Sequence, residues 1–509
     1  MSYLGIDIGT TGSKAVVFSD SGRILAESAG EYPVISIQNG WFELDSFNVI
    51  KLCKKIIADA ASLVSQYDPV KAIGIASQGE AFTLLDKDDR YLSNAMVSFD
   101  VRSKGQVEKI CEQFGREKLY KITGHSAHTL FSLFKLQWIK ENQPKIFDKA
   151  KKLLCFGDLL RYELTGQTMI SYNLAARTML FDVSKKKWSD EILDFVGISK
   201  DILSRPVASG TSAGAVKSEI AQELGLGKDV IVSTGGHDQC CGSLGVGVTG
   251  AGMAAYSIGT VECITPAFDE CVLSDTMMKS NLATYPYTLE GLYTTVAFCM
   301  TGGSGLKWFI DNLCDCEKQR AIENSSNVYE EMLGKMPVSP TDLFVLPHFT
   351  STGTPYFDPS PLGAVLGINL NTTKADLLKG VLEGITYEMK LNLGLLGSNG
   401  IAVTGLRAFG GGVRNEKWMQ IKADIFGIPI SCLEVREAGC MGAAMLAVKA
   451  AGDVSSVKEC CDSWVKVSNV YEPQDSKRAL YADKYEIYKG LYKTLEPIRK
   501  EIRNQNGKT

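Results

Sequence analysis

The sequence has no apolar run of about 18 residues, the length typical of a membrane-spanning helix. Its N-terminus has no basic stretch followed by an apolar one, so we expect neither a membrane span nor a signal peptide, and a cytoplasmic protein with no membrane partner. The net charge is only −4, from 54 Lys and Arg against 58 Asp and Glu. This balance gives no general attraction for nucleic acid, so any phosphate must be bound locally.

The 14 cysteines lack the paired C-x-x-C spacing of a zinc site. They lie among small or apolar neighbours, as in Cys240-Cys241 and at Cys299. In a reducing cytosol such residues behave as small hydrophobic side chains. We therefore expect neither a disulfide framework nor metal–thiolate chemistry.

The chain is long, at 509 residues, and its composition of 45% hydrophobic and 22% charged residues is that of a globular protein. This length exceeds what one hydrophobic core serves, so two domains of roughly 200 to 250 residues are expected. A strand, a Gly-Thr turn and a strand occur over residues 3–18 and again over 253–268. We place the boundary where this pattern restarts, which gives domains 1–246 and 247–509.

Hydrophobic spacing predicts an α/β protein. We expect helices over 47–66 and, as an amphipathic helix, over 129–142, and a buried strand over 70–79. Strand, glycine turn and helix are expected over 229–247 and over 405–427. The charged tail over 500–509 is predicted to be a frayed helix end.

The turn from Gly9 to Gly12 predicts a phosphate-binding hairpin. Its sequence, Gly-Thr-Thr-Gly, exposes backbone N–H groups and two hydroxyls on one concave edge. Asp7, at the end of the preceding strand, can hold hydrated Mg²⁺ against the phosphates. The turn from Gly9 to Gly12 is not a Walker loop, because Gly-Lys-Ser/Thr is absent and a strand, not a helix, follows. An ordinary hairpin is the alternative, but a second turn at Gly259-Thr260 would allow phosphates to be gripped from both sides of a cleft.

With these hairpins and "FGGGVRNEKW", the chain resembles the FGGY carbohydrate kinases, a branch of the sugar kinase, Hsp70 and actin superfamily, from about Tyr3 to Val448. One family signature is matched within residues 130–142 and another by "GAVLGINLNTTKADLLKGVLE" at 363–383. The departures are Leu130, where an aromatic or small residue is usual, and Gly380, where Ala or Ser is usual. The resemblance implies two duplicated actin-like (ribonuclease H-like) ATPase domains with an inter-domain cleft.

The resemblance also implies ATP and Mg²⁺ as cofactors and assigns roles by position. The phosphate motifs are Asp7, Gly9, Thr10, Thr11 and Lys14, then Gly259 and Thr260. The remaining nucleotide contacts are Gly303, Gly411, Gly412 and Asn415. The substrate-binding residues are Gln78, Glu80, Asp100, Arg102, Asp238 and Gln239. The metal ligands are Asp7 and Asp238, and the catalytic base is Asp238.

The chemistry of phosphoryl transfer supports these roles. An acceptor hydroxyl is a poor nucleophile, so a carboxylate must orient it and accept its proton. Each role has a structural alternative: Asp238 suits a helix cap, and Lys14 suits a solvated strand lysine. Asp100 and Arg102 suit a surface ion pair, and His237 suits a structural hydrogen-bonding role.

Two other functions are weighed against the kinase. "GVGVTG" at 245–250 fits the glycine pattern of Rossmann dehydrogenases, but that pattern needs a strand before it and a helix after it, and here the order is reversed. These glycines more readily permit a close inter-domain crossing. An actin-like or Hsp70-like ATPase acting on a protein partner would share the hairpins but would have no use for a sugar pocket.

The expected reaction is therefore ATP-dependent phosphorylation of a sugar hydroxyl by in-line transfer, on a ketose such as a pentulose (xylulose-like) or a related polyol. Glycerol kinases of this family carry Arg before the Glu, where this chain has Gly79. Common xylulokinases carry Met-His-Gly in place of Gln78-Gly79-Glu80. The sugar and its phosphorylated hydroxyl stay open, as does the oligomeric state, with a homodimer as one option.

Overall fold

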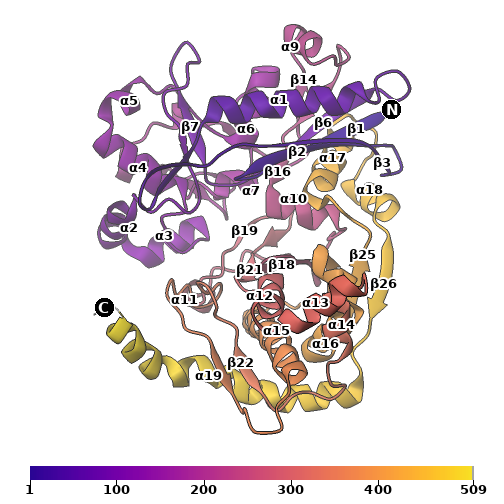
Figure 1. The fold of residues 1–509 in the computed structure, drawn as a ribbon. Helices are drawn as coiled ribbons and strands as arrows, with labels where there is room; N and C mark the ends of the chain where they lie inside the picture. Colours follow the sequence, from indigo (N-terminus) through magenta and orange to yellow (C-terminus); the bar gives the residue numbers. More distant parts are fainter. Residues whose placement is uncertain (507–509) are drawn as a thin grey trace.

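The computed structural model describes residues 1–506, which form two lobes, each built around one large mixed sheet (Figure 1). The first sheet runs in the order β14 (Ser212–Ala215), β15 (Ile231–Ser233), β6 (Val70–Ser77), β1 (Ser2–Ile8), β2 (Gly12–Phe18) and β3 (Ile24–Glu31), and β16 (Gly236–His237) also pairs with β6. The second runs β19 (Tyr285–Pro286), β20 (Tyr293–Thr294), β18 (Glu262–Phe268), β17 (Met253–Ile258), β24 (Gly405–Phe409), β25 (Ile430–Leu433) and β26 (Val467–Tyr471), with β21 (Ala297–Cys299) beside β18.

The two sheets repeat one arrangement. In the first, β1 pairs antiparallel with β2 and parallel with β6. In the second, β17 pairs antiparallel with β18 and parallel with β24. An antiparallel neighbour can follow through a tight turn, whereas a parallel neighbour needs a long crossover. Each central strand therefore ends in a short Gly-Thr hairpin, as the sequence predicts.

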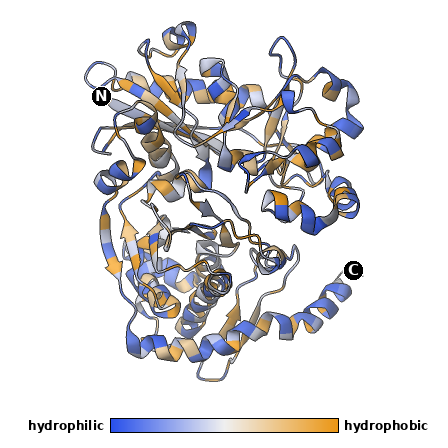
Figure 2. Cartoon of the chain, turned by 180° about the vertical axis from the view of Figure 1, so that it is seen from behind, coloured by the Kyte–Doolittle hydropathy of each residue, from blue (hydrophilic) through white to orange (hydrophobic). Residues whose placement is uncertain are grey.

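Helices cover these sheets largely where the hydrophobic spacing places them. Helix α1 (Ser46–Ser62) buries Val49, Cys53, Ile57 and Ala60 at helical intervals, and the Asp45 side chain caps its first turn. In Figure 2, hydrophobic residues concentrate on the central strands and hydrophilic ones on the outer helices. No helix within residues 1–506 is long and apolar enough to cross a membrane.

Two helical expectations need adjustment. Helix α4 (Ser132–Asn142) is buried on nearly every side instead of being amphipathic, because it packs between α2 (Lys104–Ile110) and α5 (Pro144–Lys149). The last helix, α19 (Asp475–Asn506), continues through the charged tail, and residues 507–509 of the expected frayed end lie outside the described part.

Helix α17 (Ala438–Ala450) belongs to the second half of the chain but packs against β1 and β6 of the first lobe, together with α10 (Asp238–Gly245). Backbone approaches backbone here without intervening side chains. A β-carbon added to Gly5 or Gly74 would lie 1.8 Å from a carbonyl oxygen of α17, and one added to Gly442 would lie 1.9 Å from the Cys241 oxygen. Gly245, the first glycine of "GVGVTG", faces the Ala438 carbonyl in the same way.

The next helix, α18 (Val457–Trp464), also lies on the first lobe, where Trp464 stacks on Phe18 with ring centroids 5.8 Å apart. Residues 438–464 thus return to the first lobe before β26, at Val467–Tyr471, completes the second sheet. The domain boundary between residues 246 and 247 stays a prediction. The structure adds that α17 and α18, which follow that boundary in the sequence, pack on the first lobe.

At the contact between the first sheet and α17, adding a single methyl group to a glycine should strongly destabilise the chain. Gly74→Ala should lower the free energy of unfolding by about 3 kcal/mol or more, because the added carbon meets the Ala443 carbonyl oxygen. Gly490→Ala is the matched control, since nothing lies within 4 Å of that exposed position on α19, and it should stabilise the chain by about 0.5–1 kcal/mol. Urea unfolding measures both. Equal stability of the two variants would contradict the tight crossing.

Candidate active site

The first Gly-Thr hairpin joins β1 to β2 and is fixed from several directions. The Gly9 N–H donates to the Gly12 carbonyl at 2.9 Å, which closes the turn. The Tyr32 hydroxyl and the Gln78 amide both donate to the Gly9 carbonyl, at 2.5 and 3.0 Å. The Thr10 hydroxyl donates to the Gln78 side-chain oxygen at 3.3 Å. Gln78, predicted to contact the sugar, thus directs its amide group to the hairpin.

The second hairpin, Gly259-Thr260, joins β17 to β18 and rests on the start of α12 (Gly303–Leu313). The Gly303 N–H donates to the Gly259 carbonyl at 2.8 Å, and the Ser304 hydroxyl donates to the Thr260 carbonyl at 2.8 Å. A β-carbon on Gly303 would lie 2.8 Å from the Gly259 carbonyl oxygen. The glycine predicted to contact the nucleotide therefore supports this hairpin directly.

A buried charged group lies at the base of the second hairpin. The Lys422 ammonium donates to both carboxylate oxygens of Glu262 at 2.8 and 2.9 Å and to the Tyr256 hydroxyl at 2.8 Å. Neither charged side chain is exposed, and the ammonium also lies 4.3 Å from the centre of the Trp418 ring. Because Tyr256 and Glu262 belong to β17 and β18, the group ties both arms of the hairpin to α16 (Glu416–Phe426).

Two cavities meet at the start of α10. The first, the Asp7 cavity, has a volume of about 240 Å³ and draws its walls from both lobes, with Asp7 at the end of β1 and Ser257 near the end of β17. The second, the Glu80 cavity, has a volume of about 370 Å³ and also contains Thr10 of the first hairpin. Among their lining residues, Asp238 and Gln239 belong to both. Asp238 thus lies on the wall that the two cavities share.

The carboxylates at this junction repel one another. Burial, followed by the negative charges of Asp7 and Glu80, raises the pKa of Asp238 to about 8. Burial and the nearby Glu437 carboxylate raise the pKa of Asp7 to about 6. The Gln239 N–H donates to Asp238 at 2.6 Å, and His237 Nε2 lies 3.1 Å from the same Oδ1 atom. These contacts orient one oxygen of Asp238.

The strand lysine of the first motif has an ion-pair partner from the other half of the chain. Lys14 Nζ lies 2.6 Å from Glu437, the residue just before α17. Two residues further on, a β-carbon on Gly439 would lie 2.3 Å from an oxygen of Asp7. Sequence reasoning missed both Glu437 and Gly439. The small-residue run that starts at Ala438 directly after an acidic residue is the signal that could have pointed to them.

Two predicted substrate residues lie outside both cavities. Asp100 and Arg102 form a buried ion pair at 2.7 Å, and Arg102 also pairs with Glu43 at 2.8 Å. The guanidinium lies 4.4 Å from the centre of the Trp41 ring and 5.2 Å from that of Trp138. The two residues therefore form an ion pair, as the structural alternative expects, but the pair is buried and not on the surface.

The predicted adenosine-side residues gather behind the second hairpin. Gly411 lines a further cavity of about 630 Å³, which shares Arg436 and Glu437 with the Asp7 cavity. Gly412 packs against Ile258 at the end of β17, where a β-carbon would lie 2.2 Å from that side chain. Asn415 caps α16 by accepting the Trp418 N–H at 2.9 Å. Of these three glycine-loop residues, only Gly411 lines that cavity.

The walls of the Glu80 cavity include residues that sequence reasoning did not single out. Arg177 forms an ion pair with Glu80, and Asn281, Tyr285 and Phe357 come from the second half of the chain. Three of the four histidines of the chain also line it: His125, His128 and His237. Sequence reasoning considered only His237, and the close spacing of His125 and His128 in a chain with four histidines is a signal that could have found the other two.

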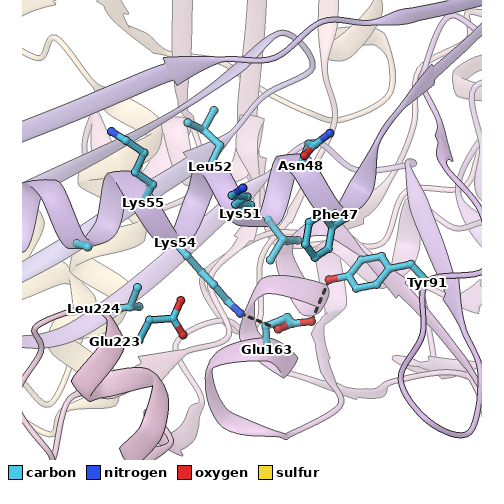
Figure 3. Close-up of a pocket in the computed structure, with 12 residues that line it drawn as sticks. Phe47, Asn48, Lys51, Leu52, Lys54, Lys55, Tyr91, Glu163, Glu223 and Leu224 are labelled. Carbon is cyan, nitrogen blue, oxygen red and sulfur yellow. Dashed lines mark hydrogen bonds and ion pairs between the residues drawn. The ribbon is translucent and has the colours of Figure 1, made fainter.

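A separate hollow lies on the outer face of α1 (Figure 3). It measures about 700 Å³ and contains none of the predicted site residues. Its polar groups bind one another, since Glu163 accepts from Lys54 at 2.8 Å and from the Tyr91 hydroxyl at 2.9 Å. We assign it no part in the chemistry.

Comparison with known proteins identifies the family. Residues 2–245 match the N-terminal domain of the FGGY family of carbohydrate kinases, and residues 254–451 match its C-terminal domain. The chain belongs to the FGGY family of carbohydrate kinases. Its reaction is the ATP-dependent phosphorylation of a sugar, and neither the dehydrogenase nor the protein-directed ATPase is favoured.

The relatives cover the whole chain. A xylulose kinase of Bacillus subtilis is 28% identical over 509 residues, 99% of each chain. A gluconokinase of Bacillus licheniformis is 26% identical over 98% of this chain and 97% of that protein. Among solved structures, a xyloylose kinase from Brucella ovis superimposes with a TM-score of 0.88 at 27% identity, covering 98% of this chain and 100% of that one. The predicted two-domain, actin-like fold is confirmed.

The buried charged group predicts how the second hairpin responds to mutation. Lys422→Met should lower the free energy of unfolding by about 3–5 kcal/mol, because it leaves the buried Glu262 carboxylate unpaired. The surface pair Lys307–Asp311 offers the control, and Lys307→Met should change stability far less. Urea unfolding of both variants checks this. Similar small effects would show that Glu262 does not depend on the lysine.

Proposed function

We propose that the chain transfers the γ-phosphoryl group of ATP to a hydroxyl of a ketose such as a pentulose (xylulose-like), or of a related polyol, with Asp238 as general base. The observation that carries this proposal is the position of Asp238 on the walls of both the Asp7 cavity and the Glu80 cavity. A base there can contact an acceptor hydroxyl in the Glu80 cavity, which Thr10 of the first hairpin also lines, and face Asp7 in the other cavity. In-line transfer requires that arrangement.

The hairpin residues bind the phosphates in this proposal. Backbone N–H groups and the hydroxyls of Thr10, Thr11 and Thr260 stabilise the charge on the γ-phosphoryl oxygens. The Gly303 N–H supports the second hairpin through its hydrogen bond to the Gly259 carbonyl. Gly411 lines the cavity of about 630 Å³, which we assign to the adenosine. Lys14 acts through its ion pair with Glu437, which links the first hairpin to α17.

The donor set also fits Mg²⁺. Asp7 and Asp238 line one cavity, and burial followed by the negative charge of Asp7 raises the pKa of Asp238; a divalent cation would relieve the repulsion. Within residues 1–506, no group of three or more His, Cys, Asp or Glu side chains could hold a metal. Mg²⁺ is usually bound by one or two carboxylates together with phosphate oxygens and water, so two carboxylates suffice. When bound, the ion neutralises phosphate charge, and Asp7 and Asp238 would hold it.

The acceptor residues follow from the Glu80 cavity. Glu80, Gln239 and Asp238 line it and offer the hydrogen-bonding groups that sugar hydroxyls need in a dry pocket. Xylulose kinases among the relatives support a pentulose, and the Bacillus licheniformis gluconokinase marks a different acceptor class to test. We retain Asp100 and Arg102 only as a buried ion pair that supports the segment containing Ser98, a residue that lines the cavity.

The role of Asp238 can be tested by removing its charge. Asp238→Asn should lower kcat by about 10²–10⁴-fold, the range of a lost general base, while the Kd for ATP changes little. Asp190→Asn, at an exposed carboxylate on α8 (Asp190–Val196), is the control and should keep full activity. Coupled ADP release gives kcat, and calorimetric titration gives the Kd. Retained turnover in Asp238→Asn would remove Asp238 from this role.

The role of Glu80 makes a separate prediction. Glu80→Ala should raise the KM for the acceptor first, since it removes a carboxylate that lines the acceptor cavity but not the Asp7 cavity. The KM for ATP should stay within about twofold. An unchanged acceptor KM would contradict the assignment. A screen of ADP release with pentuloses, hexuloses, polyols and aldoses supplies the acceptor for this measurement.

A further inference from the structure

The Glu80 cavity contains one ion pair whose geometry is unusually constrained. Arg177 donates from both Nε, at 2.6 Å, and Nη2 to a single oxygen of Glu80, Oε1. Both side chains are largely buried, with 13% of Arg177 and 6% of Glu80 exposed. The guanidinium also faces Phe131 at 5.0 Å and Tyr285 at 5.7 Å, measured to the ring centres. Two aromatic faces and one carboxylate oxygen therefore fix its plane.

The arginine occupies space that the neighbouring residue leaves free. A β-carbon on Gly79 would lie 2.9 Å from Cγ and 3.0 Å from Cβ of Arg177, and 3.0 Å from the His237 ring. The stem of Arg177 thus lies directly across Gly79. Any side chain at position 79 would displace it, so Gly79 and Arg177 form one structural unit.

The ion pair leaves two groups for a ligand. Within residues 1–506, Glu80 Oε2 accepts no hydrogen bond and Arg177 Nη1 donates none, while both residues line the cavity. One is an acceptor and the other a donor, and both belong to residues that line the cavity. The hydroxyl and carbonyl oxygens of a ketose or polyol can bind to both kinds of group.

The charge of the cavity does not suit an anion. Its lining includes Glu80 and Asp238 against a single cationic side chain, Arg177, which is already paired. The nearby histidines add no charge, because burial lowers the pKa of His125 to about 3 and that of His237 well below its usual value. The buried Lys135 ammonium lies near Glu80 but does not line the cavity, so a ligand carboxylate would meet the free Glu80 oxygen with no unpaired cation in the lining to balance it.

We propose that Arg177, laid across Gly79 and held by Glu80, determines acceptor specificity: Nη1 and Oε2 bind oxygens of a neutral ketose or polyol, and the pair excludes aldonates. This inference rests on the proposed function, because it assumes that the Glu80 cavity receives the acceptor. It names the acceptor class and adds Arg177 to the binding residues.

The first test compares acceptors of equal chain length on the wild-type protein. ADP release is measured with neutral ketoses and polyols and with the aldonate of the same carbon number, all with Mg-ATP. At least one neutral acceptor should exceed its matched aldonate in kcat/KM by about a hundredfold or more. Preference for the aldonate would overturn the inference and leave the kinase function intact. No ADP release with any acceptor would overturn both.

The second test separates a binding role from a merely structural one. Arg177→Met keeps a stem over Gly79 but removes the guanidinium, so it should raise the KM for the neutral acceptor about tenfold or more with a smaller change in kcat and an unchanged Kd for ATP. Gly79→Ala should act in the same direction by displacing the stem. Arg205→Met, at an exposed arginine of the same lobe, is the control.

Glu80→Gln tests specificity directly, because a merely structural role of the ion pair would not change the preference for neutral acceptors over aldonates. Removing the carboxylate charge should reduce the ratio of neutral to aldonate kcat/KM by about tenfold or more, since the repelling oxygen is gone. An unchanged ratio in Glu80→Gln, or an unchanged acceptor KM in Arg177→Met, would overturn the inference.

Discussion

The structure depends on the contact between α10, α17 and the first sheet, where glycines on all three elements let backbone meet backbone. Gly5 and Gly74 lie under α17, and Gly442 lies against α10. This crossing brings the end of β1, with Asp7, beside the start of α10, with Asp238. It also joins the two halves of the chain at the same place. Side chains at these glycines would separate the elements and move the two carboxylates apart.

The crossing brings acidic side chains close together, and the proposed reaction needs them there. Asp7, Asp238 and Glu437 are close enough that burial and mutual repulsion raise the pKa values of Asp7 and Asp238. Lys14 balances part of this charge through Glu437. A bound divalent cation would offset the remaining negative charge of these carboxylates. Perturbed carboxylates gathered at a junction of cavities are typical of catalytic sites.

Much of this could be predicted from sequence, because local patterns determine it. The two Gly-Thr hairpins, their flanking strands and Asp238 at a helix start follow from short motifs, and the family resemblance that those motifs carry implies the actin-like fold. What could not be predicted depends on contacts between distant segments. Arg177 reaches Glu80 across 97 residues, and α17 returns to a sheet that begins more than 400 residues earlier. The same limit explains Asp100 and Arg102: the family resemblance assigned them to the substrate, but they pair with each other, and the Arg102 guanidinium lies against Trp41 and Trp138.

The central claim is that two hairpins hold the phosphates of ATP while Asp238 contacts the acceptor from the adjoining cavity. The most direct measurement is a crystal structure of the ternary complex with Mg²⁺, a non-hydrolysable ATP analogue and the acceptor found by ADP release. The account predicts phosphates between Thr10 and Thr260 and an acceptor hydroxyl within about 3.2 Å of an Asp238 oxygen, in line with the γ-phosphorus. Phosphates bound away from either hairpin, or an acceptor hydroxyl out of reach of Asp238, would contradict it.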